Sequence, residues 1–329
     1  MIDLLPSPEQ QQIVDMAVSV LRKELPDSRL LSSRGRNLSD REAWPIFVEQ
    51  GWLALSLSEE LGGMGYGKPE LVLAHRELGR SLVSPTVLAT TLAVVATALA
   101  GNEKLSQSLL EGQRIASLGL PTRDGEEIFV IDGKPGDVVL LLDPDAATMI
   151  DFDSLACRSV DPVDPSLTLA RARPGKESAL AKIERSPQFS AIRDLVVGAQ
   201  LVGIAEATCA RSAEYAKTRE QFGQPIGSFQ AIKHRCADML VRAEVGWAQV
   251  AYASISADHG ASLADVIAGK LVASEAAVLN GQDNIQVHGA IGYTAEFDAH
   301  LFLKRAEMLS LIGGTNSSRQ RQLLDANLR

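Results

Sequence analysis

The sequence has few cysteines and few aromatic residues. Of its 329 residues, three are cysteine and 5% are aromatic. Cys157, Cys209 and Cys236 lie far apart and form no C-x-x-C pair. A disulfide framework and a zinc site are therefore not expected, and the five histidines form no metal-ligand constellation. This cysteine usage fits a reduced, cytoplasmic setting best.

Long uninterrupted apolar runs are also missing. The longest apolar stretch, LVSPTVLATTLAVVATALA at 82–100, contains Ser, Thr and Pro, which favours a buried helix over a membrane span. The start of the chain has no basic segment followed by an apolar run, so no signal peptide is predicted. The net charge of -9 makes nucleic acid and anionic membranes poor partners, because their phosphates repel an acidic chain.

Three regions with different hydrophobic patterns follow one another. Residues 1–114 are typical of a helical domain, with helices expected around 68–81 and 84–112. Residues 115–187 contain short β-type runs between Gly, Pro and Asp turns, which predict a small antiparallel or mixed β domain. Residues 188–329 repeat apolar positions with a period near 3.6, which predicts a four-helix bundle. The expected strands begin at Ile128, Val138, Thr148 and Ser166.

Four collinear motifs are more informative than this order of regions. Residues 215–238 read YAKTREQFGQPIGSFQAIKHRCAD, 286–293 read QVHGAIGY, 313–315 read GGT and 58–65 read SEELGGMG. These segments resemble the R-x-Q-F-G-x-P-I, Q-x-x-G-G-x-G, E-G-T and P-E-x-x-G-G-x-G motifs of acyl-CoA dehydrogenases, the FAD enzymes that desaturate acyl-CoA thioesters. The resemblance extends over nearly the whole chain.

The side chains in these motifs suit a dinucleotide. Arg219 can form a bidentate contact with a pyrophosphate, although an arginine taken on its own more often serves a surface ion pair. Phe222 offers a flat apolar face to an aromatic ring, Gln230 and Gln286 supply amide hydrogen bonds, and Gly289 allows close backbone approach. The resemblance implies FAD contacts at Arg219, Gln221, Phe222, Gln230, Gln286, Val287, Gly289, Ala290 and Thr315.

The catalytic base of the family is missing. The family reaction removes a proton next to the thioester carbonyl, which requires a carboxylate against that carbon. The Glu of the E-G-T motif is replaced by Gly313, and the alternative position on the first bundle helix is Arg193. Asp194 is adjacent, but one residue along a helix turns the side chain by about 100°. Asp194 is therefore a weak candidate base and more typical of a solvated or ion-paired residue.

The segments that surround the flavin ring in the family are also altered. The region that matches T-E-P-x-x-G-S-D reads ASLGLPTRDGEE at 116–127, and no W-I-T-N segment exists. In the family, the R-x-Q-F-G and Q-x-x-G-G segments reach across a dimer interface to a neighbour's FAD. The altered segments have two explanations: simple divergence with a retained flavin site, or loss of the chain's own flavin-ring site. The second is consistent with the motifs that remain, because the chain keeps the segments that serve a neighbour and has lost much of those that serve itself.

The chain therefore resembles the shorter, base-less subunit of α2β2 heterotetrameric acyl-CoA dehydrogenases that act on steroid CoA thioesters. The resemblance implies a full-length homologous partner that supplies the base and the flavin-ring site. The expected reaction is α,β-desaturation of a bulky acyl-CoA in steroid degradation. Two alternatives stay open: an autonomous flavoenzyme with different chemistry on the same fold, and a non-catalytic stabilising subunit.

Overall fold

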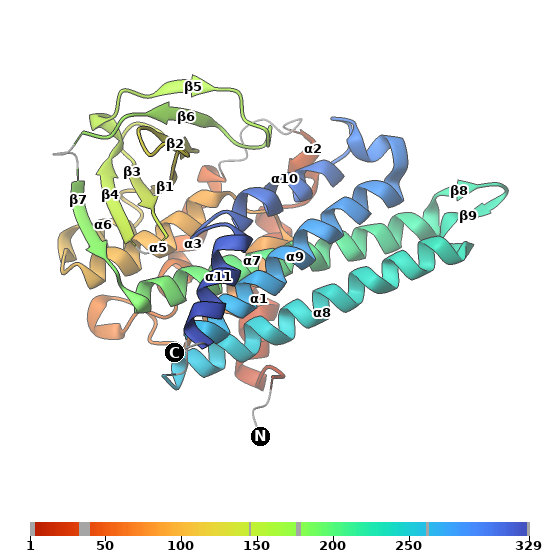
Figure 1. Ribbon diagram of the computed structural model, residues 1–329, viewed down its shortest axis with the longest axis horizontal. Coiled ribbons are helices and arrows are strands. Elements are labelled where there is room, and N and C mark those ends of the chain that lie inside the picture. Colours follow the sequence, from red (N-terminus) through yellow and green to blue (C-terminus); the bar gives the residue numbers. More distant parts are fainter. Residues whose placement is uncertain (1–3, 33–39, 145, 176–178, 261–262, 328–329) are drawn as a thin grey trace.

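The computed structural model describes residues 4–32, 40–144, 146–175, 179–260 and 263–327 (Figure 1). The chain forms an N-terminal group of helices, a central β sheet and a C-terminal bundle of long helices. This architecture confirms the predicted fold class, a mainly α protein with a small β domain. No helix in these ranges is long and apolar enough to cross a membrane.

The N-terminal helices begin and end at local capping signals. Ser7 accepts a hydrogen bond from the backbone of Gln10, whose side chain in turn accepts one from the Ser7 backbone. The single helix expected over 84–112 is two helices, because Gly101 turns the chain at a φ of +67° and Asn102 caps the next helix. The helices are α1 (Pro8–Glu24), α2 (Ser28–Ser32), α3 (Trp44–Glu49), α4 (Lys68–Arg80), α5 (Pro85–Leu99) and α6 (Glu103–Leu110).

The central sheet has seven strands in the order β5-β6-β2-β1-β3-β4-β7. It is mixed, because β1 pairs in parallel with β3 and the other pairs are antiparallel. Leu118 of β1 lies opposite Ile131 of β2 and Leu140 of β3, and these side chains join the main core. The strands are β1 (Ala116–Pro121), β2 (Ile128–Ile131), β3 (Val138–Leu142), β4 (Ala146–Asp151), β5 (Arg158–Val160), β6 (Leu169–Ala172) and β7 (Ala179–Glu184).

The C-terminal bundle contains the four predicted helices and one more, α11, which follows the GGT turn. Small residues let α7 approach α4 closely. A Cβ on Gly203 would lie 2.0 Å from the carbonyl oxygen of Arg76, and one on Gly79 would lie 2.2 Å from that of Gln200. The two helices therefore pack backbone against backbone. The helices are α7 (Pro187–Thr218), α8 (Gln230–Asp258), α9 (Leu263–His288), α10 (Ala299–Ser310) and α11 (Asn316–Asn327).

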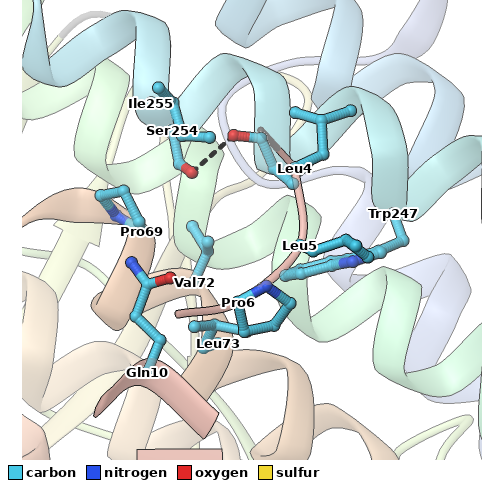
Figure 2. Close-up of a pocket in the computed structure, with 11 residues that line it drawn as sticks. Leu4, Leu5, Pro6, Gln10, Pro69, Val72, Leu73, Trp247, Ser254 and Ile255 are labelled. Carbon is cyan, nitrogen blue, oxygen red and sulfur yellow. Dashed lines mark hydrogen bonds between the residues drawn. The ribbon is translucent and has the colours of Figure 1, made fainter. Parts of the chain in front are cut away.

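The first residues of the described chain lie against α4 and α8. Leu5 and Pro6 lie beside Trp247 of α8 (Figure 2), and Gln10 donates a hydrogen bond of 2.7 Å to Glu70 of α4. The pocket left between these side chains has a volume of about 90 Å³. Ligand pockets usually measure about 300–1,000 Å³, so this contact joins the N-terminal helices to the bundle and holds no cofactor.

Candidate functional site

A cavity of about 440 Å³ lies where α7 and α9 both end. At this end of the molecule the hairpin β8 (Glu220–Gln221) and β9 (Gln224–Pro225) projects beyond the α7–α8 pair (Figure 1). Five of the nine predicted FAD contacts line the cavity, although they come from two segments about 70 residues apart. These five are Arg219, Gln221, Val287, Gly289 and Ala290.

Arg219 is positioned by the end of α7 and by the hairpin. Its backbone N–H donates to Tyr215 at 2.8 Å, and its carbonyl accepts from Ile226 at 2.8 Å. The guanidinium forms no ion pair within 4 Å in the described ranges and is exposed. The hydrogen bonds of the backbone therefore fix the position of the Arg219 main chain. Its guanidinium, which is always charged, is available to an anion.

Gly289 and the stacked rings of Tyr215 and His288 form the wall of the cavity on the α9 side. Gly289 ends α9 at a φ of +64°, and a Cβ built there would meet nothing within 4 Å, so the backbone faces open space. His288 stacks on Tyr215 with ring centroids 4.2 Å apart, and its Nδ1 lies 2.7 Å from the Asn284 carbonyl. Burial lowers the pKa of His288. His288 therefore has the contacts of a structural residue.

Three of the other predicted contacts lie outside this cavity but at the same end of the bundle. Phe222 occupies the hairpin turn at a φ of +54° and is 93% exposed, with Phe229 at 6.1 Å in an edge-on arrangement. Gln230 begins α8, and Gln286 is exposed on the last turn of α9. An aromatic ring this exposed at the end of a hairpin is suited to contact another molecule.

Thr315 lies at the opposite end of the bundle. The turn that carries it is fixed by Lys270, which donates to the Gly314 carbonyl at 3.4 Å. Lys270 lies on α9, and Gly289 comes 19 residues later, directly after the last residue of that helix. A helix of this length separates the two residues by about 28 Å. Thr315 and Gly289 therefore cannot contact the same phosphate within one chain.

Gly313 and Arg193, the two positions at which the family places its base, lie against each other. Gly313 has a φ of +75°, and a Cβ built there would lie 2.7 Å from Cζ, Nε and Nη2 of Arg193. Arg193 is fully buried on α7 and donates to the carbonyls of Asp143 and Pro144 at 3.3 and 2.5 Å. The guanidinium occupies the space into which a side chain at position 313 would project.

Asp194 belongs to the same buried network. It is 1% exposed and accepts a hydrogen bond of 2.9 Å from Nε of Arg193, and its other carboxylate oxygen pairs with Arg319 of α11. The carboxylate is thus held between two guanidinium groups, as expected for an ion-paired residue. Its role as a weak candidate base stays a prediction, but this environment favours a structural role.

Lys270 was not identified from the sequence, although it is a lysine among apolar helical positions. Its side chain is buried, and its Nζ donates to the carbonyls of Ser310 at 3.2 Å, Gly314 at 3.4 Å and Ile312. Burial, and then the positive charge of Arg193, lower the pKa of Lys270 to about 7. Lys270 therefore fixes the turn around Gly313 and adds a third basic group, after Arg193 and Arg319, to the site.

A second cavity, of about 470 Å³, lies between the sheet and α10. Ten of its fourteen lining residues are apolar. Leu120, at the end of β1, belongs to the segment that matches the family's flavin-ring motif, and Phe129 and Ile131 of β2 lie in the same wall.

No group of three or more His, Cys, Asp or Glu in the described parts of the chain could hold a metal ion.

Comparisons with known proteins agree with these motifs. Residues 7–114 match the N-terminal domain of acyl-CoA dehydrogenases, and residues 192–328 match their C-terminal domain. Acyl-CoA dehydrogenase IpdE2 of Mycobacterium tuberculosis is 32% identical over 305 residues, which is 92% of each chain. Acyl-CoA dehydrogenase FadE34 of the same organism is 36% identical over 297 residues, which cover 83% of this chain but only 41% of FadE34.

Two solved structures share the fold. The ChsE4-ChsE5 complex from Mycobacterium tuberculosis has a TM-score of 0.82 at 20% identity, with 100% of this chain and 99% of that chain covered. The Tcur3481-Tcur3483 steroid ACAD G363A variant has a TM-score of 0.78 at 21% identity, with 96% and 97% covered. At these identities the likeness establishes the fold alone.

Proposed function

The chain belongs to the acyl-CoA dehydrogenase family of FAD-dependent oxidoreductases, and we propose that it is one subunit of a heteromeric member of that family. In this proposal the chain contributes contacts to the adenosine and pyrophosphate of an FAD, and a full-length homologous partner supplies the base and the flavin-ring site. The assembly is an α2β2 heterotetramer. Its substrate is a bulky acyl-CoA, such as a steroid-derived thioester.

The contact between Arg193 and Gly313 is the observation that carries the proposal. Neither residue can accept a proton from the substrate, and a carboxylate side chain at position 313 would collide with the buried guanidinium. Asp194 is already held by two arginines. The proton transfer of the family reaction therefore needs a group from another chain.

The cavity at the ends of α7 and α9 fits the pyrophosphate of FAD. Arg219 can bind it through two parallel hydrogen bonds, and the open backbone at Gly289 permits close approach. When bound, FAD supplies the hydride acceptor for the reaction. Thr315 lies too far from this cavity to contact the same pyrophosphate, so the proposal assigns it no contact with this FAD.

Three of the similar proteins support a partner of the same kind. One structural neighbour is a complex of two proteins, ChsE4 and ChsE5, and another is a steroid enzyme whose name joins two components. FadE34 is a single chain of which 41% matches this one. The unmatched part of FadE34 is long enough for a second unit of similar size in the same polypeptide.

The test is to co-express the chain with a full-length acyl-CoA dehydrogenase encoded in the same genome and to measure FAD per heterodimer. One FAD per heterodimer and substrate-dependent flavin reduction are expected. Arg219→Ala should weaken FAD binding about 10- to 100-fold while the two chains still co-purify. Arg22→Ala, which removes an exposed arginine of α1 outside the FAD motifs, is the matched control.

Two results would contradict the proposal. If the chain alone purifies saturated with flavin and an acyl-CoA reduces that flavin, no partner is required. If the FAD content of the complex is the same with and without Arg219, the chain only stabilises its partner.

A further inference from the structure

Buried charged residues next to the cavity between the sheet and α10 fix the positions of its walls. Arg305 of α10 is buried and donates to Asp164 at 3.2 Å and to the Val83 carbonyl at 2.8 Å. Asp164 also accepts from the hydroxyl of Ser166 at 2.6 Å. These bonds hold α10 and the chain between β5 and β6 at a fixed separation, so the cavity between them needs no rearrangement to accept a ligand.

The lining of this cavity does not fit a flavin ring, although Leu120 belongs to the segment that matches the family's flavin motif. The isoalloxazine ring carries carbonyl and N–H groups that need hydrogen-bond partners when buried. Of the polar lining residues, Asp164 is engaged by Arg305 and Ser166. Thr168 donates both its N–H and its hydroxyl to Asp132, at 2.8 and 3.2 Å. The remaining surface is mainly hydrocarbon.

One cation lies at the edge of the cavity. Lys304 of α10 is half-buried, lines the cavity, and makes no ion pair within 4 Å in the parts of the chain that the structure describes. Glu307, one turn further along α10, is exposed. The mouth is flanked by the exposed apolar side chains of Val163 and Leu311, 82% and 55% exposed.

We propose that this cavity binds a hydrocarbon ligand with a single anionic end. Its chain or ring system lies against the β2 side chains and Met308, and its anion pairs with Lys304. A volume of about 470 Å³ is within the range of sites for drug-sized ligands. Neither Arg193 nor Gly313 lines this cavity, and it shares no lining residue with the Arg219 cavity, so the proposal does not depend on the proposed heteromeric function.

The experiment uses the full chain and the fluorescent probe 1-anilinonaphthalene-8-sulfonate, with dodecanoate, dodecanol and riboflavin as competitors. Met308→Trp should weaken the probe about tenfold, the equivalent of leaving about 55 Å² of apolar surface in water. Leu324→Trp introduces the same side chain at an exposed position of α11 and should change nothing. Leu311→Glu, at the exposed mouth, should also weaken the probe, because it removes an apolar contact and repels the sulfonate, and it provides a second test if Met308→Trp disturbs folding.

The anionic end is tested separately. Lys304→Gln should weaken dodecanoate about two- to fivefold, as expected for a partly exposed ion pair, and leave dodecanol unchanged. The proposal is overturned if Met308→Trp and Leu311→Glu both leave the probe bound as tightly as Leu324→Trp does. It is also overturned if riboflavin displaces the probe as well as dodecanoate does, or if only a full-length partner protein displaces it.

Discussion

Replacing Gly313 by alanine measures how firmly Arg193 fills the site of the missing base. At a φ of +75° a side chain other than glycine costs about 1–2 kcal/mol. The new Cβ would also lie 2.7 Å from three atoms of the Arg193 guanidinium, which hydrogen bonds to Asp194, Asp143 and Pro144 prevent from moving away. Overpacking of this kind costs about 1–3 kcal/mol. Gly313→Ala should therefore lower the free energy of unfolding by about 2–5 kcal/mol.

The steric part is isolated by a double-mutant cycle in urea unfolding. Arg193→Met alone should cost about 3–5 kcal/mol, because it removes one partner of a buried charge network. In the Arg193→Met background, Gly313→Ala should cost only the backbone strain, about 1–2 kcal/mol. The expected coupling between the two positions is thus about 1–3 kcal/mol. Gly101→Ala is the control, because Gly101 has a φ of +67° but nothing within 4 Å of a Cβ.

Two outcomes would refute this reasoning. The first is a cost of Gly313→Ala that is the same in both backgrounds, since the guanidinium would then not fill the space. The second is a cost no larger than that of Gly101→Ala, since backbone strain alone would then explain the effect.

Three further predictions concern the same network and the β domain. Gly313→Glu should not enable the isolated chain to oxidise an acyl-CoA, measured as flavin reduction, because Arg193 occupies the space and would pair with the new carboxylate. The folded pKa of Lys270, about 7, lies below the ordinary 10.5, so between these values the unfolded chain binds more protons than the folded chain. Lys270 should therefore raise the free energy of unfolding by up to about 1.4 kcal/mol per pH unit between pH 7 and pH 10. Lys270→Met should remove this contribution. Asp132→Ala should lower the free energy of unfolding by about 2–4 kcal/mol in urea titrations, because it leaves the buried donors of Thr168 and Ser84 without their acceptor.

The architecture could be predicted because it depends on local periodicity. The 3.6-residue repeat identified the long helices, and local signals such as the Ser7 cap mark where they begin. The break at Gly101 was missed because an apolar helical pattern continues on both sides of it. β1 was missed because its sequence, ASLGLP, ends with the strand-disfavouring residues Gly119 and Pro121. Its pairing with both β2 and β3 is a tertiary property that no local pattern reveals.

The two halves of the site differ in how far the sequence could identify them. Arg219 and Gly289 lie within contiguous motifs, and their shared cavity agrees with the resemblance. The buried network joins Arg193 and Asp194 of α7 to Lys270 of α9 and Arg319 of α11, positions up to 126 residues apart. Charged residues at such positions are usually exposed, so only the packing of the helices shows that they are buried together.

The same packing shows why the loss of the base is not undone by one substitution. The site places Arg193, Arg319 and Lys270 around the single carboxylate of Asp194, so positive charge is in excess even when Lys270 is neutral. A glutamate introduced beside these groups would be stabilised in its ionised form, which lowers its pKa and makes it a weaker base. Removing Arg193 to make room would leave Asp143 and Pro144 with unpaired carbonyls and Asp194 with one partner fewer. The glycine and the arginine therefore depend on each other, and a partner's carboxylate is the simpler source of the base.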